Sequence, residues 1–356
     1  MKKKIEPDRV KPSKAFRTKL GLSLHGFAED VLSSKLGDPF QGNVDLVFTS
    51  PPFPLNTKKK YDNLQGDAYV AWLKSFAQTF KKLIKPTGSI VMEVGNSWEP
   101  GKPVMSTLAL ESLLAFLKEG GFHLCQQFIW HNPAKLPSPA QWVTIERIRI
   151  KDSYTHLWWM SPNERPKADN RRVLVEYSAA MNRLLETKTY NSGHRPSQHK
   201  IGASSFLTNN NGAIPSSVLV EADTEHDNNA PSNVITLANT HASTDYQNYC
   251  REHGHEPHPA RMPIRLAEFF IKFLTETNDL VVDPFAGSNT TGAAAESLSR
   301  RWVSIEPNQL YVEGSKGRFP KVVLPKASTE TTASGNARLS KPVKSVKCGK
   351  SSKRKH

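Results

Sequence analysis

Residues 280–292 carry the sequence LVVDPFAGSNTTG, which predicts a buried strand, a tight loop and the first turn of a helix. The apolar run 280–282 is typical of a short strand covered on both faces. The small residues of the loop allow the backbone to approach a ligand closely. Glu306 ends the next predicted strand, where a carboxylate can accept hydrogen bonds from both hydroxyls of a ribose. These features predict a nucleoside-binding crevice at the carboxyl ends of strands, and the alternative is a strand-to-helix turn filled with small residues.

The pattern around this loop predicts the fold class. Strands are expected at 44–49, 89–94, 122–130, 280–282 and 302–305, and helices at 66–85, 105–119, 264–274 and 292–299. This alternation predicts an α/β fold with a mainly parallel, doubly wound (Rossmann-like) sheet and helices on both faces. The segment 151–255 breaks the alternation, so we expect an inserted, loop-rich module there.

A second motif, Thr49-Ser50-Pro51-Pro52-Phe53, ends the predicted strand 44–49. Prolines cannot continue a hydrogen-bonded ladder, so the chain turns out at the carboxyl end of the strand. The fixed backbone allows the Ser50 hydroxyl and the Pro51 carbonyl to converge on one point, which suits an NH2 donor. Phe53 can stack on the flat ring that carries this amine. The alternative is a proline turn that only terminates the strand.

The two motifs in one chain resemble the amino-group DNA methyltransferases, which methylate cytosine N4 or adenine N6 with S-adenosylmethionine. Residues 285–292 resemble the cofactor motif of that family, and residues 50–53 resemble its catalytic motif in the Ser-Pro-Pro-Tyr/Phe form typical of cytosine-N4 enzymes. The catalytic motif comes first, as in the beta-type order. Residues 258–263 (HPARMP) resemble the family's segment that precedes the cofactor motif and lines the methionine pocket. Three further segments resemble the Pvu-type cytosine-N4 methyltransferases of restriction–modification systems, namely 130–139 (WHNPAKLPSP), 158–162 (WWMSP) and 212–216 (GAIPS).

The resemblance, which spans about residues 20–320, implies site-specific methylation of cytosine N4 in double-stranded DNA with S-adenosyl-L-methionine as cofactor. The implied catalytic residues are Ser50, Pro51, Pro52, Phe53 and Glu93. The implied cofactor-binding residues are Asp283, Pro284, Phe285, Ala286, Gly287, Ser288, Asn289, Thr290, Glu306, His258, Pro259 and Arg261. No metal is required.

The expected mechanism depends on orientation and on acceptors placed where positive charge develops. Ser50 and the Pro51 carbonyl would accept the two N–H groups of the amine, whose lone pair then attacks the sulfonium methyl group in line. Phe53 would stack on a base flipped out of the duplex. Glu93 would polarise Ser50 or help remove the proton, and the alternative for Glu93 is a solvent-facing or capping carboxylate.

The sequence departs from the family pattern at two places. The early His-Gly-Asp pattern appears as His25-Gly26-Phe27, so the acid expected to hold the cofactor's adenine amine is missing, and Glu29 or Asp30 would substitute for it. In the cofactor loop, Asn289 stands where a glycine is usual. Asparagine tolerates left-handed backbone angles better than most residues, so this departure costs little.

Charge is concentrated at the two ends of the chain. The 356 residues have 48 Lys+Arg against 33 Asp+Glu, a formal net charge of +15. Residues 1–19 and 321–356 account for that excess, and the part between them is neutral. We therefore expect five regions, namely a basic arm (1–19), a catalytic half (20–150), a target-recognition module (151–255), a cofactor-binding half (256–320) and a disordered basic tail (321–356).

DNA contacts are expected from the basic stretch 135–200, which has twelve basic and six acidic side chains. Arg147, Arg149, Lys151, Arg171 and Arg172 are the candidates, because arginine and lysine neutralise phosphates and arginine reads guanine edges. The alternative for most of them is plain solvation. The tails would add salt-dependent, non-specific affinity for DNA.

Composition excludes several protein classes. No stretch approaches the ~20 apolar residues that span a bilayer, no apolar run follows the basic N-terminus, and three cysteines are too few for a disulfide framework. We expect a monomer or weak dimer without membrane contact, cytoplasmic and nucleoid-associated in a bacterium or nuclear in a eukaryote. The expected functional partner, though not a bound one, is a cognate restriction endonuclease.

Other functions stay open at this point. An adenine-N6 methyltransferase is the main alternative, followed by an RNA or protein methyltransferase and an inactive DNA-binding relative. A ring-carbon cytosine methyltransferase needs a nucleophilic Cys, normally after Pro, and the sequence has no Pro-Cys dipeptide. Cys250, His253, His255 and His258 have a spacing that allows a zinc site, although His258 already belongs to the segment before the cofactor loop.

Overall fold

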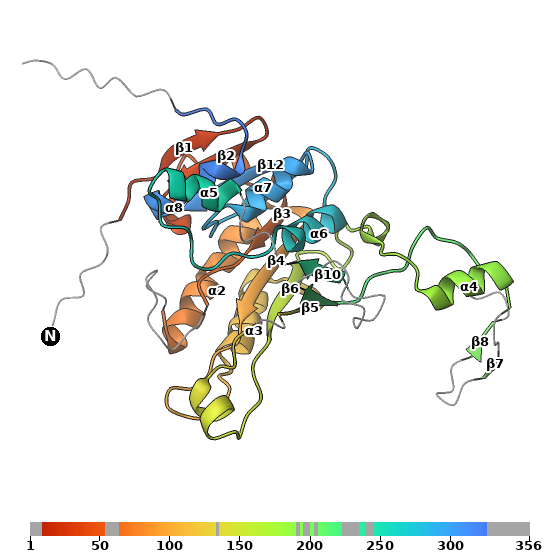
Figure 1. Cartoon of the computed structure of the whole chain (residues 1–356). Coiled ribbons are helices and arrows are strands. Elements are labelled where there is room, and N and C mark those ends of the chain that lie inside the picture. Colours follow the sequence, from red (N-terminus) through yellow and green to blue (C-terminus); the bar gives the residue numbers. More distant parts are fainter. Residues whose placement is uncertain are drawn as a thin grey trace, which may run out of the picture. The chain divides into compact units, whose positions relative to one another are not determined.

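The computed structural model describes residues 9–53, 64–132, 135–189, 193–194, 200–202, 206–222, 235–238 and 245–325 (Figure 1). Within these ranges, ten strands form one sheet in the order β1-β2-β12-β11-β3-β4-β6-β5-β9-β10, and β7 (Gly193–His194) pairs with β8 (Lys200–Ile201). The strands of the large sheet are β1 (Ser13–Arg17), β2 (Gly21–His25), β3 (Val44–Thr49), β4 (Ile84–Gly95), β5 (His123–His131), β6 (Tyr154–Ser161), β9 (Val218–Ala222), β10 (Ile235–Ala238), β11 (Leu280–Asp283) and β12 (Arg301–Glu306).

The sheet is mainly parallel, which confirms the fold class expected from the sequence. β2, β12, β11, β3 and β4 run parallel to one another, as do β5, β9 and β10. The antiparallel pairs are β1 with β2, and β6 with its neighbours β4 and β5. All six residues of β3 are buried, as the central position of this strand requires.

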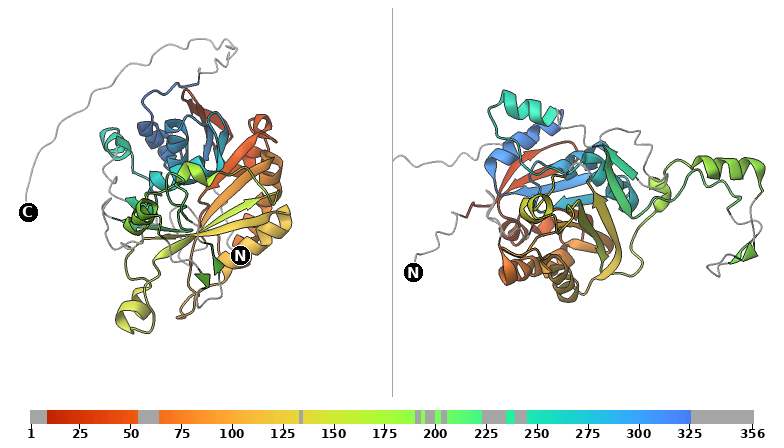
Figure 2. Two further views of the ribbon diagram at one scale, coloured as in Figure 1. Left: turned by 90° about the vertical axis from the view of Figure 1, so that its right-hand side faces the viewer. Right: turned by 60° about the horizontal axis from the view of Figure 1, so that its bottom comes forward.

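Helices cover both faces of the sheet, and each face has its own apolar core (Figure 2). Alternate residues of β3 supply the two cores, because side chains of a strand point to opposite faces. Val47 packs with the first core and Phe48 with the second. The helices of the described residues are α1 (Ala28–Leu32), α2 (Gly66–Leu83), α3 (Leu108–Gly120), α4 (Ala179–Thr187), α5 (Asp245–Glu252), α6 (Ile264–Leu274), α7 (Thr290–Ser297) and α8 (Gln309–Ser315). The cores place α2 and α3 on one face, and α6 and α7 on the other.

Three expected boundaries do not follow the observed elements. β6 is an inner strand of the sheet between β4 and β5, so a boundary at residue 151 divides the sheet instead of separating a module from it. β1 lies within the expected basic arm and pairs with β2, while Val323 of the expected tail pairs with Arg17. The described residues between 9 and 325 belong to one compact unit, and residues 1–8 and 326–356 lie outside the described residues. None of the described helices has the length and apolar character that a membrane crossing requires.

Candidate active site

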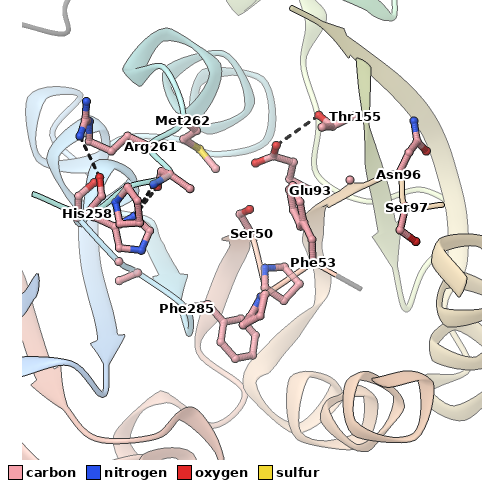
Figure 3. Close-up of a pocket in the computed structure, with 18 of the residues that line it drawn as sticks. Ser50, Phe53, Glu93, Asn96, Ser97, Thr155, His258, Arg261, Met262 and Phe285 are labelled. Atoms are coloured by element: carbon pink, nitrogen blue, oxygen red, sulfur yellow. Dashed lines mark hydrogen bonds between the residues drawn. The ribbon is translucent and has the colours of Figure 1, made fainter. Parts of the chain in front are cut away.

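A cavity of 1780 Å³ opens at the carboxyl ends of β3, β4, β11 and β12. Because these strands are parallel, the residues that follow them meet at one edge of the sheet, where α/β proteins bind their ligands. The wall contains both sequence motifs, with residues 50–53 on one side and most of the loop 283–291 on the other. Figure 3 shows Ser50, Phe53 and Glu93 facing His258, Arg261 and Met262 across this space. The structure therefore brings the predicted catalytic and cofactor residues together.

The proline motif leaves β3 and forms part of the cavity wall. Ser50, Pro51, Pro52 and Phe53 all line the cavity, and Pro51 is buried. The Phe53 ring packs against the backbone of Gly95, where an added Cβ would lie 2.5 Å from the ring. A glycine at the end of β4 thus creates the space that the aromatic ring occupies.

Glu93 is a buried acid next to the predicted catalytic serine. Glu93 is only 4% exposed, it lies beside the Ser50 side chain, and it accepts a hydrogen bond from Thr155 Oγ1 at 3.3 Å (Figure 3). Burial raises the pKa of Glu93 to about 7, although the neighbouring Ser50 and Thr155 hydroxyls and the charge of Lys135 act in the opposite direction. The carboxyl group can therefore take up or release a proton near neutral pH, directly beside Ser50.

Asp283 links the catalytic strand to the cofactor loop. Its carboxylate accepts hydrogen bonds from Thr49 Oγ1 and Thr291 Oγ1, both at 2.6 Å, and from the Phe285 amide at 3.1 Å. Burial raises the pKa of this carboxyl, while the three hydrogen bonds oppose that effect. Asp283 lines the cavity, and it also fixes the ends of β3 and β11 relative to each other.

The loop after Asp283 turns through two residues with positive φ. Gly287 has a φ of 51°, and a Cβ there would lie 3.0 Å from His258 Nε2. Asn289 has a φ of 58°, which confirms that this asparagine adopts the left-handed conformation. Its side chain accepts a hydrogen bond from the Gly292 amide and caps α7. Asn289 is absent from the cavity wall, so its predicted cofactor contact is replaced by a role in shaping the loop.

The other predicted loop residues, Pro284, Phe285, Ala286, Ser288 and Thr290, line the cavity. The Phe285 ring also packs on α2, with its centroid 5.5 Å from that of Trp72 and 5.2 Å from that of Phe76.

Glu306 lies at the end of β12, as expected from the sequence, and lines the cavity. Its two carboxylate oxygens accept hydrogen bonds from the amides of Gly287 and Asn308, each at 2.8 Å. Burial raises the pKa of Glu306 to about 7. Each oxygen keeps lone pairs that can accept a further hydrogen bond.

The segment 258–262 lines the cavity on the side that faces Ser50 (Figure 3). His258, Pro259 and Arg261 all line the cavity, and the Arg261 guanidinium donates to the His258 carbonyl at 2.9 Å. The His258 ring packs edge-on against Tyr311 with centroids 4.5 Å apart. Burial lowers the pKa of His258, and the charges of Arg261 and Arg318 add to this effect.

Arg318 supports the cofactor loop without lining the cavity, and the sequence did not reveal this role. Its Nε donates to the Ser288 carbonyl at 2.6 Å and its Nη2 to Ser288 Oγ at 2.9 Å. The guanidinium lies over the Tyr246 ring at 4.5 Å, and the Tyr246 hydroxyl accepts from the His258 amide at 2.9 Å. Burial lowers the pKa of Arg318 to about 10. The arginine follows α8 in a short 3-10 turn (Lys316–Arg318), and no motif in the sequence marks it.

The structure distinguishes Glu29 from Asp30, the two acids that could replace the missing aspartate. Glu29 lines the cavity, together with Phe27 and Ala28. Asp30 is absent from the cavity wall and forms an ion pair with Arg9 at 2.9 Å. The geometry favours Glu29.

The candidate DNA-contacting residues fall into two separate groups. Arg147, Arg149 and Lys151 are exposed and lie between β5 and β6, in a segment that also lines the cavity. Arg171 and Arg172 instead form ion pairs with Asp169 (2.8 Å) and Glu276 (2.6 Å). Glu276 precedes β11, so this second pair lies at the end of the sheet away from the cavity and is not part of the site.

The possible zinc ligands are not assembled. The described ranges hold no group of three or more His, Cys, Asp or Glu side chains that could bind a metal ion. Cys250 is buried beside Gly314, His258 lies beneath Gly287, and His253 stacks on Tyr249.

Comparison with known proteins gives a consistent result. A family model described as DNA methylase matches residues 44–317. The type II methyltransferase M.PvuII of Proteus hauseri is 43% identical over 279 residues, which are 78% of each chain. M.BglII of Bacillus subtilis is 25% identical over 288 residues, or 80% of this chain and 65% of that protein. A solved structure of the PvuII cytosine-N4-specific DNA methyltransferase aligns with a TM-score of 0.64 and 35% identity, covering 85% of this chain and 88% of that one.

Proposed function

Because this chain belongs to the DNA methylase family, we propose that it methylates the N4 amine of cytosine at a specific sequence in double-stranded DNA. The observation that carries the proposal is the position of Ser50 beside the buried Glu93 carboxyl, in the same cavity as most of the loop 283–291. The Ser-Pro-Pro-Phe form of the motif and the likeness to a cytosine-N4-specific enzyme favour cytosine over adenine. The likeness to type II methyltransferases supports a place in a restriction–modification system, where methylation would protect DNA from a cognate endonuclease.

The residues of the cavity fit S-adenosylmethionine, which would supply an electrophilic methyl group on a sulfonium sulfur. Glu306 would accept the ribose hydroxyls, and Glu29 would hold the adenine amine. Gly287 lacks the Cβ that would crowd the His258 ring, so the loop can approach a nucleoside closely. His258, Pro259 and Arg261 would line the methionine end.

The serine is placed to act as an acceptor for the target amine. Ser50 lies in the cavity beside Glu93, so its hydroxyl oxygen would accept one N–H of the amine, and the Pro51 carbonyl would accept the other. Both contacts favour a tetrahedral nitrogen whose lone pair faces the methyl group. When the amine takes the methyl group it must lose one proton, which ionised Glu93 would accept by way of the neighbouring Ser50 hydroxyl. Phe53 provides the flat surface on which the flipped base stacks.

Nucleoside mass spectrometry of plasmid DNA incubated with the protein and S-adenosylmethionine tests the proposal. N4-methylcytosine is the expected product. N6-methyladenine would mean that the target base is adenine, and unmodified DNA would overturn the proposal. Ser50→Ala should abolish methyl transfer while calorimetric titration still detects cofactor binding. Ser75→Ala, which removes an exposed hydroxyl on α2, is the matched control and should leave the rate unchanged.

A further inference from the structure

The segment between β5 and β6, residues 136–151, exposes an unusual number of apolar side chains. We call it the β5–β6 finger. Leu136 is 79% exposed, Ile145 68%, Ile148 48% and Ile150 89%. Single exposed apolar residues are common on protein surfaces, whereas a cluster of them marks an interaction site. Arg147, Arg149 and Lys151 alternate with these isoleucines, so the apolar surface has a positive border.

The β5–β6 finger is held in place by contacts of its own. The Trp142 carbonyl accepts hydrogen bonds from the amides of Ile148 (2.9 Å) and Arg149 (3.2 Å), which close the tip onto the short π-helix Gln141–Ile145. Arg149 Nε also donates to the Pro103 carbonyl at 3.0 Å. The backbone turns at Arg147 with a φ of 57°, a conformation that nonglycine residues adopt only when their surroundings enforce it. The exposed isoleucines are therefore presented by an ordered turn.

The same finger forms part of the catalytic cavity. Ser138, Pro139 and Trp142 line the cavity, and the Trp142 ring packs on Trp98, another lining residue, with centroids 5.5 Å apart. Ile145, Ile148 and Ile150 are absent from the lining and point to solvent. One face of the finger thus belongs to the site where a flipped base would be held, and the other face is apolar and basic.

We propose that the β5–β6 finger is the wedge that keeps the target cytosine out of the helix, with its isoleucines occupying the gap in the base stack. This inference rests on the proposed function, because it assumes a base-flipping DNA enzyme. Apolar side chains inserted between base steps offset the lost stacking, and flanking cations neutralise the adjacent phosphates. The finger combines both features next to the cavity. A protein-binding surface would not need to adjoin the catalytic cavity. The experiment below distinguishes such a surface from a wedge.

The experiment compares two duplexes that contain the methylation site identified with wild-type protein. In the first, guanine pairs with the target cytosine, and in the second an abasic site replaces that guanine. Removing the partner base lowers the cost of flipping before the protein binds. The triple variant Ile145→Ala/Ile148→Ala/Ile150→Ala should methylate the intact duplex ~10- to 100-fold more slowly than wild type under single-turnover conditions. On the abasic duplex, its rate should come within about threefold of wild type.

Two controls separate a wedge from a general defect. Leu114→Ala on α3 truncates an equally exposed apolar residue (65%) and should match wild type on both duplexes. The variant Ile145→Ala/Ile148→Leu/Ile150→Ala should regain part of the methylation rate on the intact duplex, because leucine returns apolar volume to the tip of the finger. Thermal unfolding and cofactor titration check that each variant is folded.

The outcomes are distinct. A defect limited to the intact duplex supports the wedge. An equal defect on both duplexes would mean that the finger shapes the site, and no defect on either would mean that its apolar surface serves another partner, so both results overturn the inference. A wild-type protein that methylates no DNA would instead overturn the proposed function.

Discussion

Replacing Glu93 by glutamine should remove a specific pH dependence from the stability of the protein. Burial raises the pKa of this carboxyl from 4.5 to about 7, and the amide of glutamine does not titrate. In the wild type, the folded state holds the Glu93 proton over a pH range in which the unfolded state has already lost it. The free energy of unfolding therefore falls as the pH rises from about 4.5 to about 7, and it recovers on acidification.

The size of the effect follows from the shift in pKa. One pKa unit corresponds to about 1.4 kcal/mol, so the full shift amounts to roughly 3 kcal/mol across this window. The side chain is only 4% exposed, so solvent screening removes little of this energy. Glu306 and Asp283 have pKa values shifted in the same direction, but they are present in both proteins and cancel in the comparison.

Urea unfolding at about pH 5 and about pH 8 provides the measurement. The difference in free energy of unfolding, Glu93→Gln minus wild type, should become more positive by about 2–3 kcal/mol at the higher pH. Glu186→Gln changes an exposed carboxylate on α4 and should leave the wild-type pH dependence intact. A difference between Glu93→Gln and wild type that stays constant with pH would refute the reasoning. In activity assays, wild-type kcat should rise through about pH 7 as Glu93 ionises, and Glu93→Gln should lack that rise.

Three further substitutions test the cavity wall and the residues that hold the cofactor loop in shape. Arg318→Ala removes two charge-assisted hydrogen bonds to Ser288. Calorimetric titration should therefore show the affinity for S-adenosylmethionine reduced about 30-fold, with partial recovery in Arg318→Lys. Unchanged affinity would contradict a role of Arg318 in ordering the loop. Gly95→Ala places a methyl group 2.5 Å from the Phe53 ring. It should lower the single-turnover methylation rate about tenfold while cofactor affinity is retained. A normal rate would show that the ring moves aside without loss of activity. Asn289→Ala should cost about 1–2 kcal/mol of unfolding free energy in urea and Asn289→Gly less, because only alanine is strained at a φ of 58°; equal costs would argue against this backbone effect.

The sequence predicted the two loops of the site because each follows a short apolar strand and carries a distinctive motif. The observed β3, β11 and β12 lie where the apolar runs 44–49, 280–282 and 302–305 indicated. In parallel sheets such strands bring their carboxyl ends to one edge, so the meeting of Ser50 with the cofactor loop followed from motif position alone.

Other features depend on contacts between distant segments, and local patterns do not encode them. β6 carries an apolar run typical of a strand, yet its antiparallel insertion between β4 and β5 is set by pairing partners that sequence spacing does not specify. Arg318 reaches Ser288 across 30 residues, and its guanidinium gives no local signal. The DNA-contact prediction for Arg171 and Arg172 stays untested, but composition could not show that these arginines have acidic partners, which are Asp169 and Glu276.

The pairing of β3 with β11 also constrains when the enzyme can become active during its synthesis. The Thr49–Asp283 hydrogen bond joins residues 234 positions apart, so the centre of the sheet cannot close until nearly the whole chain has left the ribosome. At ~5–20 residues per second, the catalytic strand waits roughly 10–50 s for its partner. During that interval β3 has an unpaired edge, which makes the nascent chain a candidate for chaperone protection. A translation product that stops before residue 280 has a complete Ser-Pro-Pro-Phe motif but lacks the strand that would hold it in place.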